Sequence, residues 1–377
     1  MIRNRHHDYL NIIRFVLSIS ETFIADIHAV TQVVRVFCNE CLFLFAAIQK
    51  KGGKEMAYLL LVIGFVLLIK GADFFVEGSS SVAKILKVPS IIIGLTVVAF
   101  GTSMPEASVS ITSALKGANE LAVSNVLGSN IFNLLIVLGC SALMRPLHAS
   151  DQVVQKELPF SIFITAVLVL FSVGFDFSGV LSGNGTYVIS RLEGIVLLIL
   201  FVYFVGSQVS GALKARKEGI ALEEEEYEVL SPAKSALYII GGIIAIVFGG
   251  DFVVNSATEI ALHFGLSQTF IGLTIVAMGT SLPELVTSIV AAKKGENDLA
   301  LGNALGSNIF NILLILGAST AIFPISVEVA AIYDMIILIA MSIFAYWCAR
   351  TKKTLSKGEG AVFLILYAVY FVYIYTR

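Results

Sequence analysis

Charged residues are scarce in this sequence. Of its 377 residues only 14% are Asp, Glu, Lys or Arg, 57% are hydrophobic, and the mean hydropathy is +0.90. A soluble domain carries roughly 25% charged residues. The composition therefore excludes an ordinary soluble domain and predicts an integral membrane protein.

Cysteine and histidine are also few. The four cysteines do not form a disulfide framework, and the CxxC spacing of Cys38 and Cys41 has no second pair to complete a metal or redox site. None of the five histidines lies near the two motifs described below, and the chain has no HExxH sequence. An intramembrane protease is therefore disfavoured, and no catalytic or cofactor-binding residue is predicted.

Long apolar segments, by contrast, follow one another regularly from Met56. A membrane-spanning helix needs roughly 20 consecutive apolar residues, and ten segments are close to or above that length. They lie near residues 57–77, 80–115, 120–144, 157–174, 187–209, 235–255, 262–293, 298–322, 329–349 and 360–376. The predicted fold class is an all-α polytopic membrane protein with ten transmembrane helices.

The ten predicted helices divide into two sets of five. The first repeat is predicted at residues 56–210 and the second at 235–377. The polar stretch 211–234, which contains the run Glu223–Glu226, is predicted to be an acidic cytoplasmic linker. This run favours a solvated loop over a regulatory Ca²⁺ site. Residues 1–55 contain no apolar run of spanning length, so we expect them to be an N-terminal extension outside the fold.

The two halves repeat each other in sequence. Gly94–Gly139 aligns without a gap to Gly272–Gly317, with 29 identities in 46 positions. Five helices in each half would give the halves opposite orientations, and inverted repeats of this kind place a binding site near the bilayer midplane, at broken helices. If the first loop after Met56 is cytoplasmic, fifteen later basic residues fall inside and three outside, which agrees with the positive-inside rule.

The first repeated motif is GTSMPE at residues 101–106, which returns as GTSLPE at 279–284. An acid at the bilayer centre costs roughly 2.5–3.5 kcal/mol, and proline interrupts the helix. Glu106 and Glu284 could offset this cost by sharing a cation; alternatively each is protonated or caps a helix break. Further oxygen ligands are predicted from hydroxyl groups and from carbonyls that the prolines release, at Thr102, Ser103, Thr280, Ser281, Ala99 and Ala277. An all-oxygen set suits Ca²⁺, Mg²⁺ or Na⁺.

The second repeated motif is GSNIFN at residues 128–133 and 306–311. Its serine and last asparagine are spaced i, i+4 and share one helix face, so hydroxyl and amide ligands are predicted at Ser129, Asn133, Ser307 and Asn311. The neighbouring asparagines are expected to form interhelical hydrogen bonds; they are Asn125, Asn130, Asn303 and Asn308. Three acids outside both motifs favour a structural or gating role, namely Asp73, Glu77 and Asp251.

Together the two motifs resemble the α-repeats of the sodium/calcium exchanger family, part of the calcium:cation antiporter superfamily, and especially its bacterial inner-membrane members. The resemblance covers Met56–Arg377. It implies ten helices in two inverted repeats, a multi-pass protein of the plasma (inner) membrane, and exchange of Ca²⁺ for Na⁺ by alternating access. The metal ligands of the family fall on the twelve residues predicted above. Some relatives carry an aspartate where Asn311 stands, so this site has two carboxylates, which argues against K⁺ dependence.

The sequence thus predicts a secondary antiporter, not an enzyme. Its expected partners are Ca²⁺ and Na⁺ as transported ions and the lipid bilayer, with no nucleic acid, no cofactor and a monomeric transport unit. Coupling to H⁺, or transport of another divalent cation, stays open because protons can replace Na⁺ at carboxylates. A cation channel lined by the paired acids is the alternative from another class, although inverted halves with broken helices favour alternating access.

Overall fold

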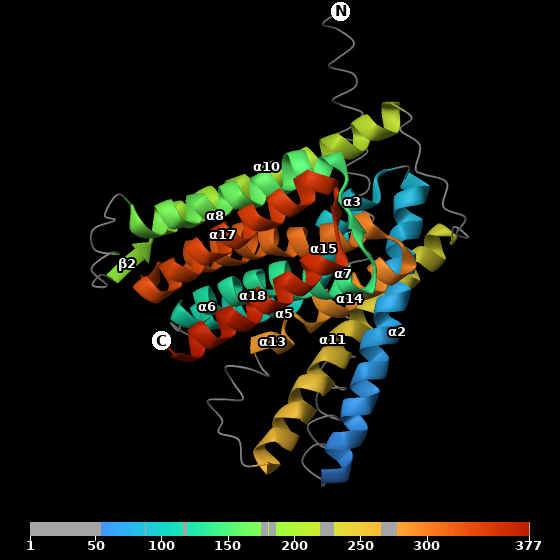
Figure 1. The fold of residues 1–377 in the computed structure, drawn as a ribbon, viewed down its shortest axis with the longest axis horizontal. Coiled ribbons are helices and arrows are strands. Elements are labelled where there is room, and N and C mark those ends of the chain that lie inside the picture. The colour runs from blue at the N-terminus through green and yellow to red at the C-terminus, as the bar shows by residue number, and fades with distance from the viewer. Residues whose placement is uncertain are drawn as a thin grey trace, which may run out of the picture. The chain divides into compact units, whose positions relative to one another are not determined.

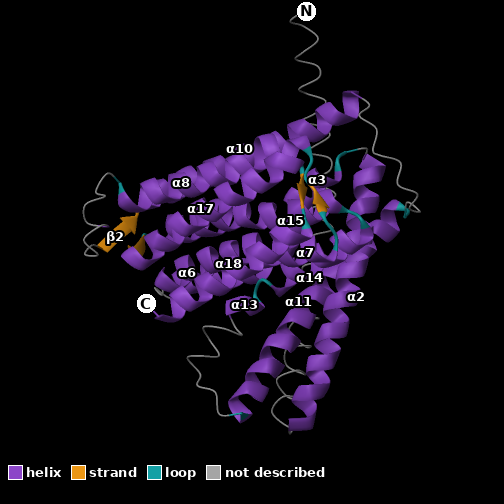
Figure 2. Ribbon diagram, in the orientation of Figure 1, coloured by secondary structure: helices purple, strands orange, loops and turns teal. Residues whose placement is uncertain are grey.

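The computed structural model describes residues 54–86, 88–115, 119–174, 180, 186–218, 230–264 and 277–376, most of which are helical (Figure 1, Figure 2). Three regions with predictions lie outside these residues. They are residues 1–53 of the expected extension, the acidic run of the linker, and residues 265–276.

The helices of the first repeat follow the predicted apolar segments. In chain order they are α2 (Lys54–Leu86), α3 (Ser90–Ile93), η1 (Gly94–Val98), α4 (Ala99–Thr102), α5 (Met104–Leu115), α6 (Asn119–Phe132), η2 (Asn133–Val137), α7 (Leu138–Met144), η3 (Val153–Glu157), α8 (Leu158–Val173) and α10 (Arg191–Glu218). The η elements are π-helical turns within longer helices. Helix α10 continues beyond its predicted end at residue 209.

Among the described residues of the second repeat the elements follow a similar order. They are α11 (Pro232–His263), α13 (Ala277–Gly279), α14 (Leu282–Lys294), α15 (Asn297–Phe310), η5 (Asn311–Leu316), α16 (Gly317–Ile322), α17 (Val329–Lys352) and α18 (Lys357–Thr376). In this part of the chain η3 of the first repeat has no counterpart before α17. The positions of α13, α14 and α15 correspond to those of α4, α5 and α6.

Eight helices in the described part are long and apolar enough to cross a membrane, or nine if the bent pair α3–α4 and α5 is one span. The predicted helical, multi-span fold class is confirmed. The predicted count of ten is not reached within the described residues, because the segment 262–293 includes residues 265–276. The predicted boundary near residue 78 is wrong. Helix α2 runs to Leu86, and the extended Pro89 (φ −56°, ψ 137°) precedes the next helix at Ser90.

Within the described residues, two short β-ladders, which were not predicted, join loops of the two repeats. Strand β1 (Leu147–His148) pairs antiparallel with β4 (Thr354–Leu355), and β2 (Thr186–Ile189) pairs antiparallel with β3 (Ile325–Glu328). Because β1 precedes α8 and β2 follows it, the ladders lie at opposite ends of this helix. Each ladder joins loops that the predicted topology places on the same side of the membrane. Strands of two to four residues are too short for a readable alternation of apolar and polar residues.

Helices α2 and α11, equivalent in the two repeats, pack against each other in opposite directions. A Cβ atom on Gly64 would lie 2.9 Å from the carbonyl oxygen of Gly249, and one on Gly71 would lie 3.0 Å from that of Gly242. Small residues allow this close approach of helix backbones. Because residue numbers rise along one helix as they fall along the other, the packing supports the predicted inversion of the repeats.

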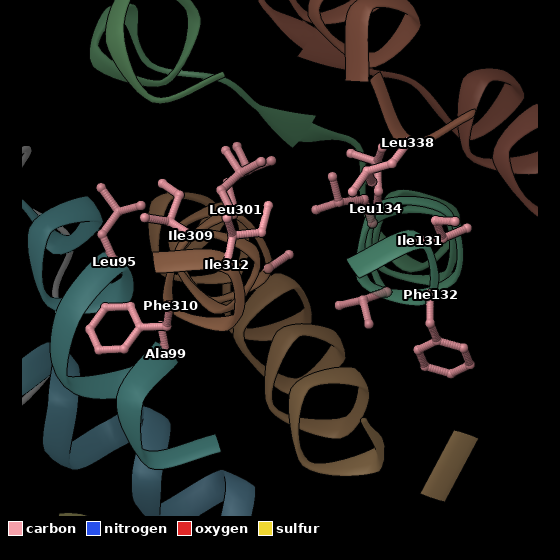
Figure 3. Close-up of a cluster of buried hydrophobic side chains, with 14 of the residues drawn as sticks. Leu95, Ala99, Ile131, Phe132, Leu134, Leu301, Ile309, Phe310, Ile312 and Leu338 are labelled. Atoms are coloured by element: carbon pink, nitrogen blue, oxygen red, sulfur yellow. The ribbon is translucent and has the colours of Figure 1, made fainter. Parts of the chain in front are cut away.

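Helix α15 lies at the centre of the helices that carry the two motifs. Of the 18-residue apolar window within Asn297–Ile322, 94% is buried, against 17% of the corresponding window within Arg191–Ala215 of α10. A Cβ atom on Gly306 would stand 2.7 Å from the Cβ of Ala99, so α15 and α4 are nearly in backbone contact. Around this contact Leu95 and Phe310 close an apolar cluster (Figure 3). The same close packing positions the polar residues described next.

Candidate functional site

Each repeat breaks a helix two residues before its proline. Ser103, between α4 and α5, has φ −83° and ψ 8°, and Ser281, before α14, has φ −92° and ψ 7°. The axis bends by 50° between the helices that flank Ser103. Proline is tolerated in the first turn of the new helix, where no backbone N–H is needed. Consequently Glu106 and Glu284 each stand in the first turn of a helix, where its dipole favours a carboxylate.

The two glutamates are fully buried and are held by the opposite repeat. Both side chains have 0% exposure. Ser281 Oγ donates a hydrogen bond to Glu106 Oε1 at 3.0 Å, and Ser103 Oγ donates to Glu284 Oε1 at 3.0 Å. The structure therefore brings the two copies of the first motif together, although 178 residues separate them in sequence.

The serines of the second motif contact the same carboxylates. Ser129 Oγ lies 3.4 Å from Glu106 Oε1 and Ser307 Oγ lies 3.3 Å from Glu284 Oε1, each as the donor. The Oε2 atom of either glutamate is buried and has no hydrogen-bond partner among the described residues. An unpaired carboxylate oxygen at this depth is costly unless it meets a cation or a proton. These two oxygens are therefore available to a cation.

Thr102 is buried and connects the two repeats, because its Oγ1 donates to Asn303 Oδ1 at 2.9 Å. Thr280 is half-buried beside Ser281. The prediction that proline leaves the Ala99 carbonyl free is wrong, since this oxygen accepts the N–H of Ser103 at 3.0 Å. The N–H missing at Pro105 would have reached Gly101, four residues earlier. Ala277 is the first residue of α13.

Two asparagines of the second helices brace the helix breaks. Asn125 Nδ2 donates to Ser110 Oγ at 2.9 Å and to the Glu106 carbonyl at 3.4 Å. Asn303 Nδ2 makes the equivalent bonds to Ser288 Oγ and to the Glu284 carbonyl, at 2.8 and 3.1 Å. The predicted interhelical hydrogen bonds of these residues are confirmed.

Asn133 and Asn311 each begin a π-helical turn, η2 and η5, which the sequence did not reveal. Such turns occur often at functional sites, because they shift side chains out of the regular helical register. Both asparagines have 0% exposure. Neither polar atom of the Asn133 amide, nor Asn311 Oδ1, has a hydrogen-bond partner in the described part of the chain. Buried amide oxygens without partners are available as neutral ligands.

The resulting site contains two carboxylates and a surround of hydroxyl and amide oxygens. Within the described residues no cluster of three or more His, Cys, Asp or Glu side chains is found. The donors described above are carboxylate, hydroxyl and amide oxygens, a set that suits hard cations and disfavours zinc or copper.

Outside this site, the acids of α2 meet a lysine at the end of α14. Lys294 Nζ lies 3.6 Å from Asp73 Oδ1 and 3.9 Å from Glu77 Oε2, and it donates to the Asp73 carbonyl at 2.9 Å. This structural role agrees with the prediction for Asp73 and Glu77. Asp251, the repeat partner of Asp73, is exposed.

Comparison with known proteins matches the repeat pattern. A family profile described as sodium/calcium exchanger protein matches residues 56–209 and 234–376, which is most of the chain. The chain belongs to the sodium/calcium exchanger family. This confirms the resemblance inferred from the two motifs. The family consists of membrane transporters and is not a class of enzymes, so this exchanger is a multi-pass membrane protein and a cation antiporter.

Relatives of this exchanger are similar over nearly their whole length. Inner membrane protein YrbG of Escherichia coli is 36% identical over 81% of this chain and 93% of the relative. Sodium/calcium exchanger MaX1 of Methanosarcina acetivorans is 31% identical over 84% and 98%. The solved structure of the sodium-calcium exchanger NCX_Mj, soaked with Na⁺ and Sr²⁺, superposes with a TM-score of 0.71 at 31% identity, covering 85% of this chain and 99% of that one.

Proposed function

We propose that this exchanger moves Ca²⁺ across the plasma (inner) membrane in exchange for Na⁺. The observation that carries the proposal is the pair of fully buried glutamates, each held by serines of both repeats with one oxygen unpaired. Two buried negative charges match the charge of one Ca²⁺, and Na⁺ can occupy the same oxygens. The names of MaX1 and NCX_Mj, both sodium/calcium exchangers, support this choice of ions.

The proposed ligands are the two carboxylates together with neutral oxygens from both repeats. The neutral oxygens belong to Thr102, Ser103, Ser129, Asn133, Ala277, Thr280, Ser281, Ser307 and Asn311. Equivalent residues from inverted repeats would alternately open the site to each side, with α2 and α11 sliding past the broken helices. Gly64 and Gly71 of α2 lie against Gly249 and Gly242 of α11, and we call this contact the glycine seam. The glycine seam supports movement of the two helices as one pair, since it holds their backbones together. One chain would form the complete transport unit, because both repeats lie within it.

The test is ⁴⁵Ca²⁺ uptake into proteoliposomes loaded with Na⁺ and diluted into Na⁺-free buffer. We expect uptake that requires internal Na⁺ and is lost in Glu106→Gln and Glu284→Gln, because either change removes half of the negative charge of the site. Glu328→Gln, which alters an exposed acid, serves as the control. Each variant should keep its elution profile and thermal stability.

Three results would contradict the proposal. Retained Na⁺-driven uptake in either glutamine variant would exclude the buried pair as the ion site. Uptake driven equally by a pH gradient alone would assign proton coupling to the same carboxylates. Ca²⁺ flux without any counter-ion would indicate a channel.

A further inference from the structure

Asn130 of α6 and Asn308 of α15 form two reciprocal hydrogen bonds that join the repeats, called here the reciprocal asparagine pair. Asn130 Nδ2 donates to the carbonyl oxygen of Asn308 at 3.2 Å, and Asn308 Nδ2 donates to that of Asn130 at 3.1 Å. Both residues are almost completely buried. A side-chain amide has one donor group and one acceptor oxygen. Since the NH₂ group of Asn130 is committed to Asn308, its oxygen is fixed on the other side.

The fixed oxygen of Asn130 meets one candidate ligand. Asn311 Nδ2 donates to Asn130 Oδ1 at 2.9 Å, and Asn311 Oδ1 is left buried with no partner among the described residues. The equivalent bond from Asn133 to Asn308 is absent from this part of the chain, where neither polar atom of Asn133 is paired. The reciprocal asparagine pair is thus symmetric. By contrast, only Asn130 accepts a hydrogen bond from a candidate ligand amide, that of Asn311.

We propose that Asn130 is a positioning residue that presents the oxygen of Asn311 to the transported cation. The inference rests on the proposed function, because it needs a cation at Glu106 and Glu284. The two ends of an amide have nearly the same shape, but its oxygen attracts a cation and its NH₂ group repels it. An acceptor fixed beside Asn311 admits only the NH₂ group there and so turns the oxygen toward the site. Partners that orient a metal ligand typically affect metal affinity 10–100-fold.

The test compares Asn130→Ala with Asn308→Ala in the full chain. Each variant removes one hydrogen bond of the reciprocal asparagine pair, but only Asn130→Ala removes the Oδ1 atom that accepts the hydrogen bond of Asn311. We expect the KM for Ca²⁺ in Na⁺-driven uptake to rise about tenfold in Asn130→Ala and less than about threefold in Asn308→Ala. Equilibrium Ca²⁺ binding to the purified protein should weaken in the same order, while the two variants lose similar thermal stability.

A double-mutant cycle isolates the contact with Asn311. If Asn130 acts through Asn311, Asn130→Ala causes no further loss of Ca²⁺ affinity in an Asn311→Ala background, whereas Asn308→Ala has the same effect in both backgrounds. Where an alanine variant does not fold, Asn130→Ser and Asn308→Ser replace the pair, since serine keeps a polar group but is too short to reach Asn311.

The outcomes separate this inference from the proposed function. Equal effects of the two alanine variants, or an undiminished effect of Asn130→Ala in the Asn311→Ala background, would overturn the positioning role. If Glu106→Gln still abolishes uptake in that case, the proposed function stands. If Glu106→Gln retains Na⁺-driven uptake, the proposed function itself fails, and the role of Asn130 fails with it.

Discussion

Ser103 of the first repeat donates a hydrogen bond to Glu284 of the second at 3.0 Å, and Ser281 returns the same contact to Glu106. In each motif the serine stands three residues before the glutamate, which is the spacing of a capping box within one helix. Ser281 makes no such side-chain cap to its own helix. Each repeat instead holds the carboxylate of the other, so neither half forms the site alone.

Because of these crossed hydrogen bonds, we expect substitution of either serine to have the same effect on Ca²⁺ binding. We predict that Ser103→Ala and Ser281→Ala each raise the KM for Ca²⁺ about tenfold or more. A hydrogen bond to a charged group contributes about 1.5–3 kcal/mol, and 1.4 kcal/mol corresponds to a factor of ten. Ca²⁺-dependent uptake measures the change. Ser326→Ala, at an exposed position of β3, is the control. An unchanged KM in either variant would mean that the crossed bonds do not support the site.

The contact of Lys294 with Asp73 and Glu77 ties α14 to α2. If α2 moves during transport, this ion pair must break, so Lys294→Gln should speed turnover at saturating Ca²⁺. Partly exposed ion pairs contribute about 0.2–1 kcal/mol, which predicts roughly a 1.4-fold to fivefold increase in turnover. The KM for Ca²⁺ should stay the same, because the contacts of Lys294 with Asp73 and Glu77 lie outside the site.

The neighbouring exposed residue provides the control for this charge. Lys293→Gln removes the same positive charge from the same helix end and should leave turnover unchanged. High salt should reduce the difference between Lys294→Gln and the unaltered protein, since salt screens exposed charges. Equal turnover of both lysine variants would show that the ion pairs of Lys294 with Asp73 and Glu77 do not slow the movement of α2.

The glycine seam between α2 and α11 predicts opposite responses at adjacent positions. A Cβ atom on Gly242 would lie 2.8 Å from the carbonyl oxygen of Gly71, whereas one on Gly241 would meet nothing within 4 Å in the described structure. Gly242→Ala should therefore destabilise the protein by about 1–3 kcal/mol, as overpacking of a close contact does. Thermal unfolding in detergent measures the loss. Gly241→Ala should unfold at the original temperature or slightly above it, because alanine is the better helix former. Equal melting temperatures of the two variants would argue against the close seam.

Glu157 is a buried acid that the proposed mechanism does not use. It is 2% exposed and accepts hydrogen bonds from Gln208 Nε2 at 3.2 Å and from Gln152 Nε2 at 3.1 Å. Glu157→Ala would leave both amides without this acceptor, so we predict a loss of about 1–3 kcal/mol in the free energy of unfolding. The KM for Ca²⁺ should not change. A raised KM with normal stability would instead assign Glu157 to ion binding, and Glu328→Ala gives the baseline for an exposed acid.

Much of this protein follows from the order of its residues. Long apolar segments require helices, because backbone groups in lipid must bond within their own segment. The repeated GTSxPE motif combines serine, proline and glutamate in an order that starts a helix, and this located both helix breaks. Residue type alone therefore indicated the ligand chemistry, since no histidine or cysteine accompanies the acids.

Other features depend on the packing between the repeats. The crossed serine–glutamate hydrogen bonds, the reciprocal asparagine pair and the β-ladders all join residues far apart in the chain. Nothing local distinguishes Asn130 from Asn308, because the same six residues surround both. Their roles differ because hydrogen bonds are directional and a buried amide must satisfy its donors and acceptor at once. Which oxygens stay unpaired for a cation is therefore decided by the tertiary structure.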